Sequence, residues 1–119
     1  MSSKVPLGGF RGLLLMQRVA FKMKLRKGFE EEYKRRHTAL WPNLQVLLQQ
    51  AGIKAYSIFL DETTSDLIGC FSIDDATKLD ALPAEPVMKK WWAYMADIME
   101  TNEDKSPISI PLKEVFYLP

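Results

Sequence analysis

The single histidine of the chain, His37, lies among aromatic residues at helical spacing. Tyr33 comes four residues before it and Trp41 four residues after it, so the three side chains share one face if this stretch is a helix. An imidazole has an unperturbed pKa of about 6.5 and can both give and take a proton near neutral pH. The arrangement therefore indicates either proton transfer in an aromatic pocket or a core histidine hydrogen-bonded to the backbone.

A second aromatic group lies in the stretch KKWWAYM, residues 89–95. Trp91 and Trp92 are neighbours, and neighbouring residues on a helix diverge by about 100°, so both cannot occupy the centre of one buried stripe. Indole rings provide flat platforms for the C–H faces of sugars and suit a partly wet pocket. A histidine, two tyrosines and a tryptophan pair, with no second catalytic carboxylate evident, predict proton transfer on a neutral, hydroxyl-rich ligand.

The pattern of apolar residues predicts the elements that position these groups. Alternating side chains in residues 18–25 predict a strand, and steps of three and four from Phe29 to Leu48 predict a helix. Pro42 predicts a kink in this helix or the start of a second helical segment. KAYSIFLD, residues 54–61, and LIGCFSI, residues 67–73, predict two strands joined as a hairpin through the turn ETTSD.

The second half of the chain repeats this order. Asp74, Asp75 and Thr77 can cap a short helix that runs to Leu82. Pro83 and Pro86 then break the chain before a helix at 87–99, and LKEVFYL predicts a last strand at 112–118. The order β-α-β-β-α-β predicts an α+β fold of the ferredoxin-like split β-α-β type, with helices on one face of an antiparallel sheet.

Both faces of the predicted sheet carry apolar groups. Tyr56, Ile58 and Leu60 project to one side of their strand, and Ala55 and Phe59 project to the other. A chain of 119 residues, 47% hydrophobic and 26% charged, is one ordinary globular domain that is small for a deep pocket of its own. We therefore predict a homodimer in which two sheets pack face to face, a dimeric α+β barrel.

Charge and cysteine content limit the classes of partner and site. Sixteen basic and fifteen acidic residues give a formal charge of +1, which indicates neither nucleic acid nor an anionic membrane as a partner. Cys70 is the only cysteine, so no internal disulfide can form, and no Cys/His cluster has metal-ligand spacing. We interpret Cys70 as a small buried side chain, and we expect a cytoplasmic protein without a metal site.

Residues 1–15 differ from the rest of the chain. The segment MSSKVPLGGFRGLLL contains a proline and three glycines, and its apolar run is too short for a signal peptide or a membrane span. We interpret it as an N-terminal extension, either disordered or a remnant of an expression vector. Residues 16–119 are expected to form a single domain.

The chain resembles the L-rhamnose mutarotase family over residues 16–119. Four separated blocks carry the resemblance in order: EEYKRRH with ALWPNL, AYSIFLD, KKWWAYMADIM, and SPIS with the terminal EVFYLP. The resemblance implies a dimeric α+β barrel and a sugar epimerase that acts at the anomeric carbon of L-rhamnose without a cofactor. By motif, it implies that His37 is the catalytic proton donor and that Tyr33, Tyr56, Trp91 and Trp92 bind the substrate.

Two other classes of function stay open at this point. Dimeric α+β barrels also include small monooxygenases and haem-binding proteins, and fold alone does not separate these from a mutarotase. A sensor that binds a sugar on the same aromatic platform without turnover is the second alternative.

Overall fold

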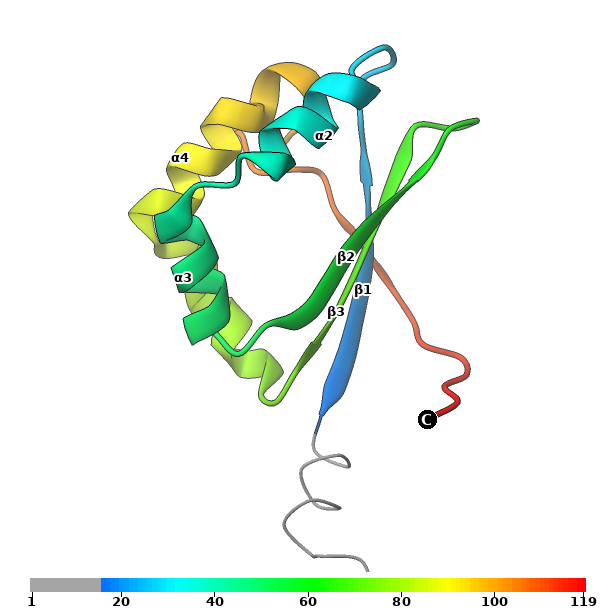
Figure 1. Cartoon of the computed structure of the whole chain (residues 1–119), viewed down its shortest axis with the longest axis vertical. Coiled ribbons are helices and arrows are strands. Elements are labelled where there is room, and N and C mark those ends of the chain that lie inside the picture. The colour runs from blue at the N-terminus through cyan, green and yellow to red at the C-terminus, as the bar shows by residue number, and fades with distance from the viewer. Residues whose placement is uncertain (1–15) are drawn as a thin grey trace, which may run out of the picture.

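The structure is a computed structural model that describes residues 16–119, with one antiparallel sheet and its helices on one face (Figure 1). The strands are β1 (Gln17–Lys24), β2 (Lys54–Asp61), β3 (Asp66–Ile73) and β4 (Ile110–Leu112). Their order across the sheet is β2-β3-β1-β4. Residues 1–15, predicted above as an extension, lie outside the described residues.

Proline residues set where the helices begin. The helices are α2 (Glu30–Thr38), α3 (Pro42–Gln50) and α4 (Pro86–Met95), with 3₁₀ segments η2 (Ala76–Ala84) and η3 (Ala96–Ile98). Pro42 and Pro86 each begin a helix, where the missing N–H of proline would have had no intrahelical partner. Pro42 therefore starts a second segment, which was one of the two predicted outcomes. No helix within residues 16–119 is long and apolar enough to cross a membrane.

The connections confirm the predicted fold class. Helices α2 and α3 join β1 to β2, the hairpin joins β2 to β3, and η2 and α4 lead from β3 to β4. Every neighbouring pair of strands is antiparallel. This is the ferredoxin-like split β-α-β arrangement, and it places α2, α3 and α4 against the same face of the sheet (Figure 1).

The inner face of the sheet, which faces the helices, supplies half of the core. The chain's most completely buried large side chains within the described residues come from both layers: Leu25, Leu44, Leu67, Ile73, Met95 and Ile98. Each such burial contributes about 1.5–3 kcal/mol relative to an exposed side chain. Gly69 in β3 has a specific role here, because a Cβ at this position would overlap the ring of Phe21 on the neighbouring strand.

The predicted final strand is wrong in its position. Residues 112–118 were expected to form it, but β4 spans only Ile110–Leu112. The pairing with β1 ends at Leu112, opposite Ala20, although β1 extends back to Gln17; at Glu114 the contact with β1 is made by side chains, through Arg18. Within residues 16–119 no other strand pairs with residues 113–118, and Val115, Phe116 and Leu118 remain 77–89% exposed.

The outer face of the sheet, which faces away from the helices, carries exposed apolar side chains. Phe59 on β2 is 63% exposed, and Ile110 and Leu112 on β4 are also exposed. Phe59 pairs with Ile68 of β3, and Leu112 pairs with Ala20 of β1, with Lys22 of β1 between Ile68 and Ile110. The outer face therefore carries an apolar strip with residues from all four strands, interrupted by Lys22. The predicted distribution of apolar groups on both faces is therefore present.

Candidate functional site

A cavity of about 1320 Å³ lies between the helices and the inner face of the sheet. All five residues predicted for the site line it: Tyr33 and His37 from α2, Tyr56 from β2, and Trp91 and Trp92 from α4. The volume exceeds the range of about 300–1,000 Å³ typical of small-molecule pockets. The fold thus brings together residues that are up to 59 positions apart in the sequence.

His37 is held in one orientation by its own helix and by aromatic neighbours. Its Nδ1 lies 3.0 Å from the carbonyl oxygen of Tyr33. A carbonyl only accepts, so Nδ1 carries the proton and Nε2 is the basic nitrogen of the neutral ring. The imidazole stacks on the Tyr33 ring at 4.2 Å and meets the Trp91 indole edge to face at 5.3 Å. The Tyr33 carbonyl and the rings of Tyr33 and Trp91 cover the other sides of the half-buried imidazole. Nε2 is therefore the nitrogen that is available to a ligand in the cavity.

We expect the His37 imidazole to titrate below its ordinary pKa of about 6.5. Burial lowers this pKa, and the hydrogen bond to the Tyr33 carbonyl only partly offsets the effect. Between the lowered pKa of the folded state and about pH 6.5, the unfolded chain therefore binds more protons at His37 than the folded chain does. The stability that neutral His37 contributes is present above about pH 6.5 and is lost as the pH falls through the folded pKa. An NMR titration can follow this one histidine without ambiguity, and a midpoint at or above 6.5 would contradict the prediction.

Tyr33 and Tyr56 approach the cavity from opposite layers of the fold. Burial raises the pKa of Tyr33 well above its usual range, with a smaller contribution from the nearby Tyr56. Tyr56 is 39% exposed as a whole residue, but its ring packs against Phe71 at 5.3 Å and Phe21 at 6.2 Å, and the loss of hydration there raises its pKa to about 12. Both hydroxyls stay protonated near neutral pH, so they can donate hydrogen bonds to a ligand but are poor bases.

A β-bulge lies at the start of β2, directly before Tyr56. The register between β2 and β3 shifts between Lys54 and Ser57, and Ala55 has a positive φ of 53°, an unfavourable region for a residue with a Cβ. Tyr56 alternates regularly with Ile58 and so lies on the inner face next to Phe21 and Phe71, whereas the extra residue turns Lys54 to the outer face, opposite Ser72. Bulges at the edge of a sheet commonly redirect a side chain in this way.

Substitutions at Ala55 should reveal this backbone strain. We expect Ala55→Val to lower the free energy of unfolding by about 1–3 kcal/mol, because a β-branched residue tolerates positive φ poorly. Ala55→Gly should keep the parent stability or exceed it, since glycine adopts this conformation freely. Urea unfolding of both variants measures the difference, and equal stabilities would show that the bulge is not retained in solution.

The two tryptophans have different surroundings, as their divergence on a helix predicts. Trp91 is only 6% exposed and contacts His37, Trp41 and Tyr94 at centroid distances of 5.1–5.6 Å. Trp92 is half-buried and packs at the edge of the core. Trp91 thus packs against His37 from the core, whereas the indole of Trp92 has more of its surface free to contact a ligand.

The cavity also contains residues that the sequence interpretation missed. Glu30, Glu31 and Glu62 line it together with Ser106 and Ser109. Glu30 lies three residues before Tyr33 and seven before His37, a helical spacing that would have placed it on the same face. The two serines come from an irregular segment before β4, so no periodicity marks them.

The donor set of the site does not resemble a metal centre. Within residues 16–119, His, Cys, Asp and Glu side chains form no group of three that could hold a metal ion. The groups around His37 are aromatic rings and a backbone carbonyl, which suit an uncharged organic ligand.

Comparison with known proteins identifies the family. The family profile described as L-rhamnose mutarotase matches residues 18–118. An L-rhamnose mutarotase from Brucella anthropi is 53% identical over 103 residues, which is 87% of this chain and 97% of that protein. A candidate antibiotic biosynthesis monooxygenase from Nitrosomonas europaea, 11% identical over 85% of this chain and 91% of its own, has a TM-score of 0.57 and shares the fold alone.

A solved relative agrees in both fold and sequence. The crystal structure of an L-rhamnose mutarotase from Formosa agariphila is 48% identical, covers 87% of this chain and 99% of its own, and superposes with a TM-score of 0.81. Similarity of this extent covers every element that lines the cavity. This chain belongs to the L-rhamnose mutarotase family.

Proposed function

We propose that the protein interconverts the α and β anomers of L-rhamnopyranose, with His37 as the group that transfers the proton. The observation that carries the proposal is the position of His37 in the cavity. Its Nδ1 is occupied by the Tyr33 carbonyl, so Nε2 remains for a ligand, and the two tyrosines and two tryptophans lie around the same space. The choice of L-rhamnose as the sugar rests on the family to which the chain belongs.

The chemistry of anomer exchange matches these groups. The ring opens when the anomeric hydroxyl loses its proton and the ring oxygen gains one, so that the C1–O bond to the ring breaks and an aldehyde forms. Rotation about C1–C2 and closure with the opposite hand reverse both proton transfers. In our proposal the protonated form of His37 gives its Nε2 proton to the ring oxygen and takes a proton back on closure, while a water accepts the anomeric proton, because the Tyr33 and Tyr56 hydroxyls are poor bases.

The remaining residues bind and orient the sugar. Tyr33 and Tyr56 donate hydrogen bonds to its oxygens, because their raised pKa values keep the hydroxyls protonated. Trp91 and Trp92 provide indole surface for its C–H face. No electron or group is transferred to a second molecule in this reaction, so its chemistry calls for no cofactor.

Saturation-transfer NMR at anomeric equilibrium tests the proposal. The protein should accelerate exchange between the α and β anomeric proton signals of L-rhamnose without net consumption of sugar, because a catalyst changes the rate and not the ratio. A buffer matched in total imidazole controls for free acid–base catalysis. Unchanged exchange would reject the proposal; sugar binding without acceleration would then indicate a sensor, and a Soret band on addition of haem would indicate the haem-binding class.

We also propose that the active form is a homodimer, assembled through the outer face of the sheet. The apolar strip that includes Phe59, Ile110 and Leu112 and the exposed side chains of Val115 and Phe116 have no cover within the described chain. A second copy would cover both. We also propose that the protein works in the cytoplasm, a reducing compartment in which the thiol of Cys70, the only cysteine of the chain, stays reduced.

Light scattering should give the mass of two chains at micromolar concentration. Phe59→Glu is expected to shift the protein to monomer, because a carboxylate buried between two sheets loses its hydration without a partner. Val46→Glu is a matched control, since Val46 is a similarly exposed apolar residue on α3, away from the sheet. A monomer for the parent chain, or equal effects of the two variants, would contradict the dimer proposal.

A further inference from the structure

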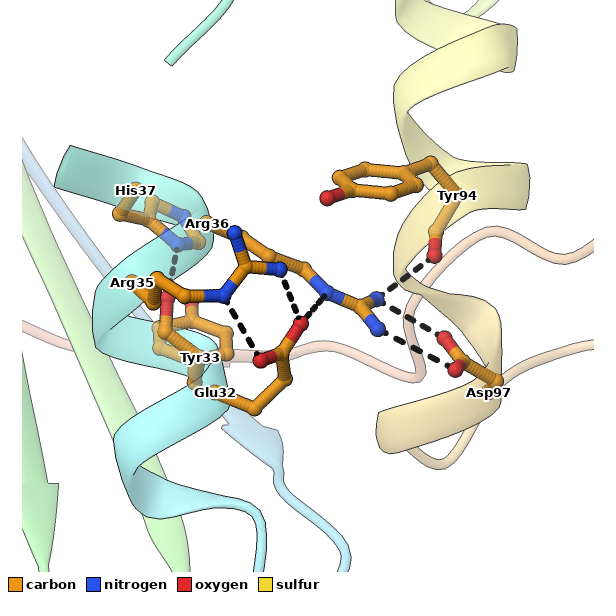
Figure 2. Close-up of polar contacts among 7 residues, drawn as sticks. All are labelled: Glu32, Tyr33, Arg35, Arg36, His37, Tyr94 and Asp97. Carbon is orange, nitrogen blue, oxygen red and sulfur yellow. Dashed lines mark hydrogen bonds and ion pairs between the residues drawn. The ribbon is translucent and has the colours of Figure 1, made fainter. Parts of the chain in front are cut away.

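Arg36 is the one buried charged residue in residues 16–119, at 9% exposure. It precedes His37 directly on α2 and points the opposite way, toward the C-terminal end of α4 (Figure 2). Long cationic side chains are rarely this buried unless they are paired. The proposed reaction makes no use of Arg36, which has no place among the residues that line the cavity.

The guanidinium of Arg36 contacts two separate parts of the chain. On its own helix, Nε donates to a carboxylate oxygen of Glu32 at 2.7 Å. Across the helix interface, Nη1 donates to the carbonyl of Tyr94 at 2.8 Å and to Asp97 at 2.9 Å, and Nη2 donates to the second oxygen of Asp97 at 3.2 Å (Figure 2). The guanidinium carbon also lies 4.5 Å from the centroid of the Tyr94 ring.

These bonds join the two helices that form the site. Helix α2 carries His37, and α4 carries Trp91. The ring centroids of these two residues are 5.3 Å apart. Apolar contacts hold two helices together but constrain their relative orientation only weakly. A planar guanidinium with two bonds to one carboxylate permits only a narrow range of geometries. The carbonyl of Tyr94 lies in the last turn of α4, where carbonyl groups commonly need partners from outside the helix, and Arg36 donates to it.

We propose, on the basis of the function proposed above, that Arg36 is a positioning residue that fixes α2 against α4 and thereby sets the His37 imidazole against the Trp91 indole. It touches neither the cavity nor the sugar. Its contribution is to keep Nε2 of His37 at one place relative to the sugar platform, and a displacement of about 1 Å at a reacting group can cost up to about 100-fold in rate.

Arg35 provides a matched control for this proposal. It stands next to Arg36 and donates two hydrogen bonds to the same Glu32, at 2.9 and 2.6 Å. Its side chain is 63% exposed, and its bonds to Glu32 stay within α2; toward α4 it approaches the Tyr94 hydroxyl but makes no bond to Asp97. Loss of Arg35 therefore removes a charge and an ion pair from the same carboxylate without removing a link to Asp97.

The experiment compares Arg36→Met, Arg36→Lys and Arg35→Met in the full chain by two measurements. The first is the chemical shift of the His37 imidazole protons without sugar, which senses the ring current of Trp91 and needs no activity. The second is the anomer exchange rate as a function of L-rhamnose concentration. Arg36→Met should move the His37 signals and lower kcat by about 10- to 100-fold, with a smaller change in KM. Arg36→Lys should recover part of both, and Arg35→Met should change neither.

Unmoved His37 signals in Arg36→Met, or equal changes in Arg35→Met, would overturn the proposal. If Arg36→Met does not fold, Asp97→Asn replaces it, since this variant keeps the side-chain shape and weakens the bond to Arg36; His37 signals identical to the parent would then overturn the proposal. A parent protein that does not accelerate exchange would refute the proposed function, and the His37 shifts would still decide whether Arg36 positions the ring.

Discussion

His37→Asn is expected to lower the catalysed exchange of L-rhamnose anomers by about 10²- to 10⁴-fold, the usual contribution of a positioned acid–base group. Asparagine keeps a polar side chain of moderate size, but an amide does not bind or release a proton near neutral pH. Tyr33 and Tyr56 cannot replace the imidazole, because burial raises both of their pKa values far above neutrality. Saturation-transfer NMR at several sugar concentrations measures the loss.

The affinity for the sugar separates catalysis from folding in this variant. Tyr56, Trp91 and Trp92 remain in place, so binding of L-rhamnose measured by titration calorimetry should stay close to that of the parent protein. Loss of binding together with loss of rate would indicate that the cavity has collapsed. Parent-like exchange rates would assign His37 to the core, the other role that its pattern in the sequence permits.

The sequence predicts correctly those elements of the fold that depend on local chemistry. Strict alternation predicts β1, and Pro42 stands at the first residue of α3, as its missing N–H requires. The last strand was misplaced for a tertiary reason. The segment LKEVFYL has the composition of a strand, but its backbone pairing with β1 ends at Leu112, and Glu114 contacts β1 through the Arg18 side chain instead. Pairing of strands depends on what lies opposite, which composition does not contain.

Some residues of the candidate site and its surroundings could be predicted from the sequence, and others could not. Aromatic and ionisable residues at helical spacing mark Tyr33, His37 and the tryptophan pair, and all of them line the cavity. Nothing in EEYKRRH distinguishes Arg36 from Arg35, since both are strong helix formers that follow an acidic turn. The difference is made by Asp97, about sixty residues later, which meets only one of the two arginines.

Trp91→Ala is expected to lower the free energy of unfolding by about 3–5 kcal/mol, the usual cost of removing a large buried aromatic side chain. Trp91 is 6% exposed, belongs to the main core cluster, and packs against the rings of Trp41, Tyr94 and His37. Trp92→Ala should cost less, because its half-buried ring already contacts solvent. Urea unfolding followed by circular dichroism compares the two variants directly.

The neighbouring tryptophans should also differ in what they do to the sugar. Trp92→Ala is expected to weaken L-rhamnose binding by about 3- to 10-fold, the equivalent of one lost ring contact, while the protein stays folded. Trp91→Phe keeps an aromatic ring in the core and should retain most of the stability, so its remaining loss of binding or rate reports the contact with His37. If Trp91→Ala and Trp92→Ala destabilise the protein equally, then α4 does not present one indole to the core and the other to the cavity in solution, and both residues belong to the packing alone.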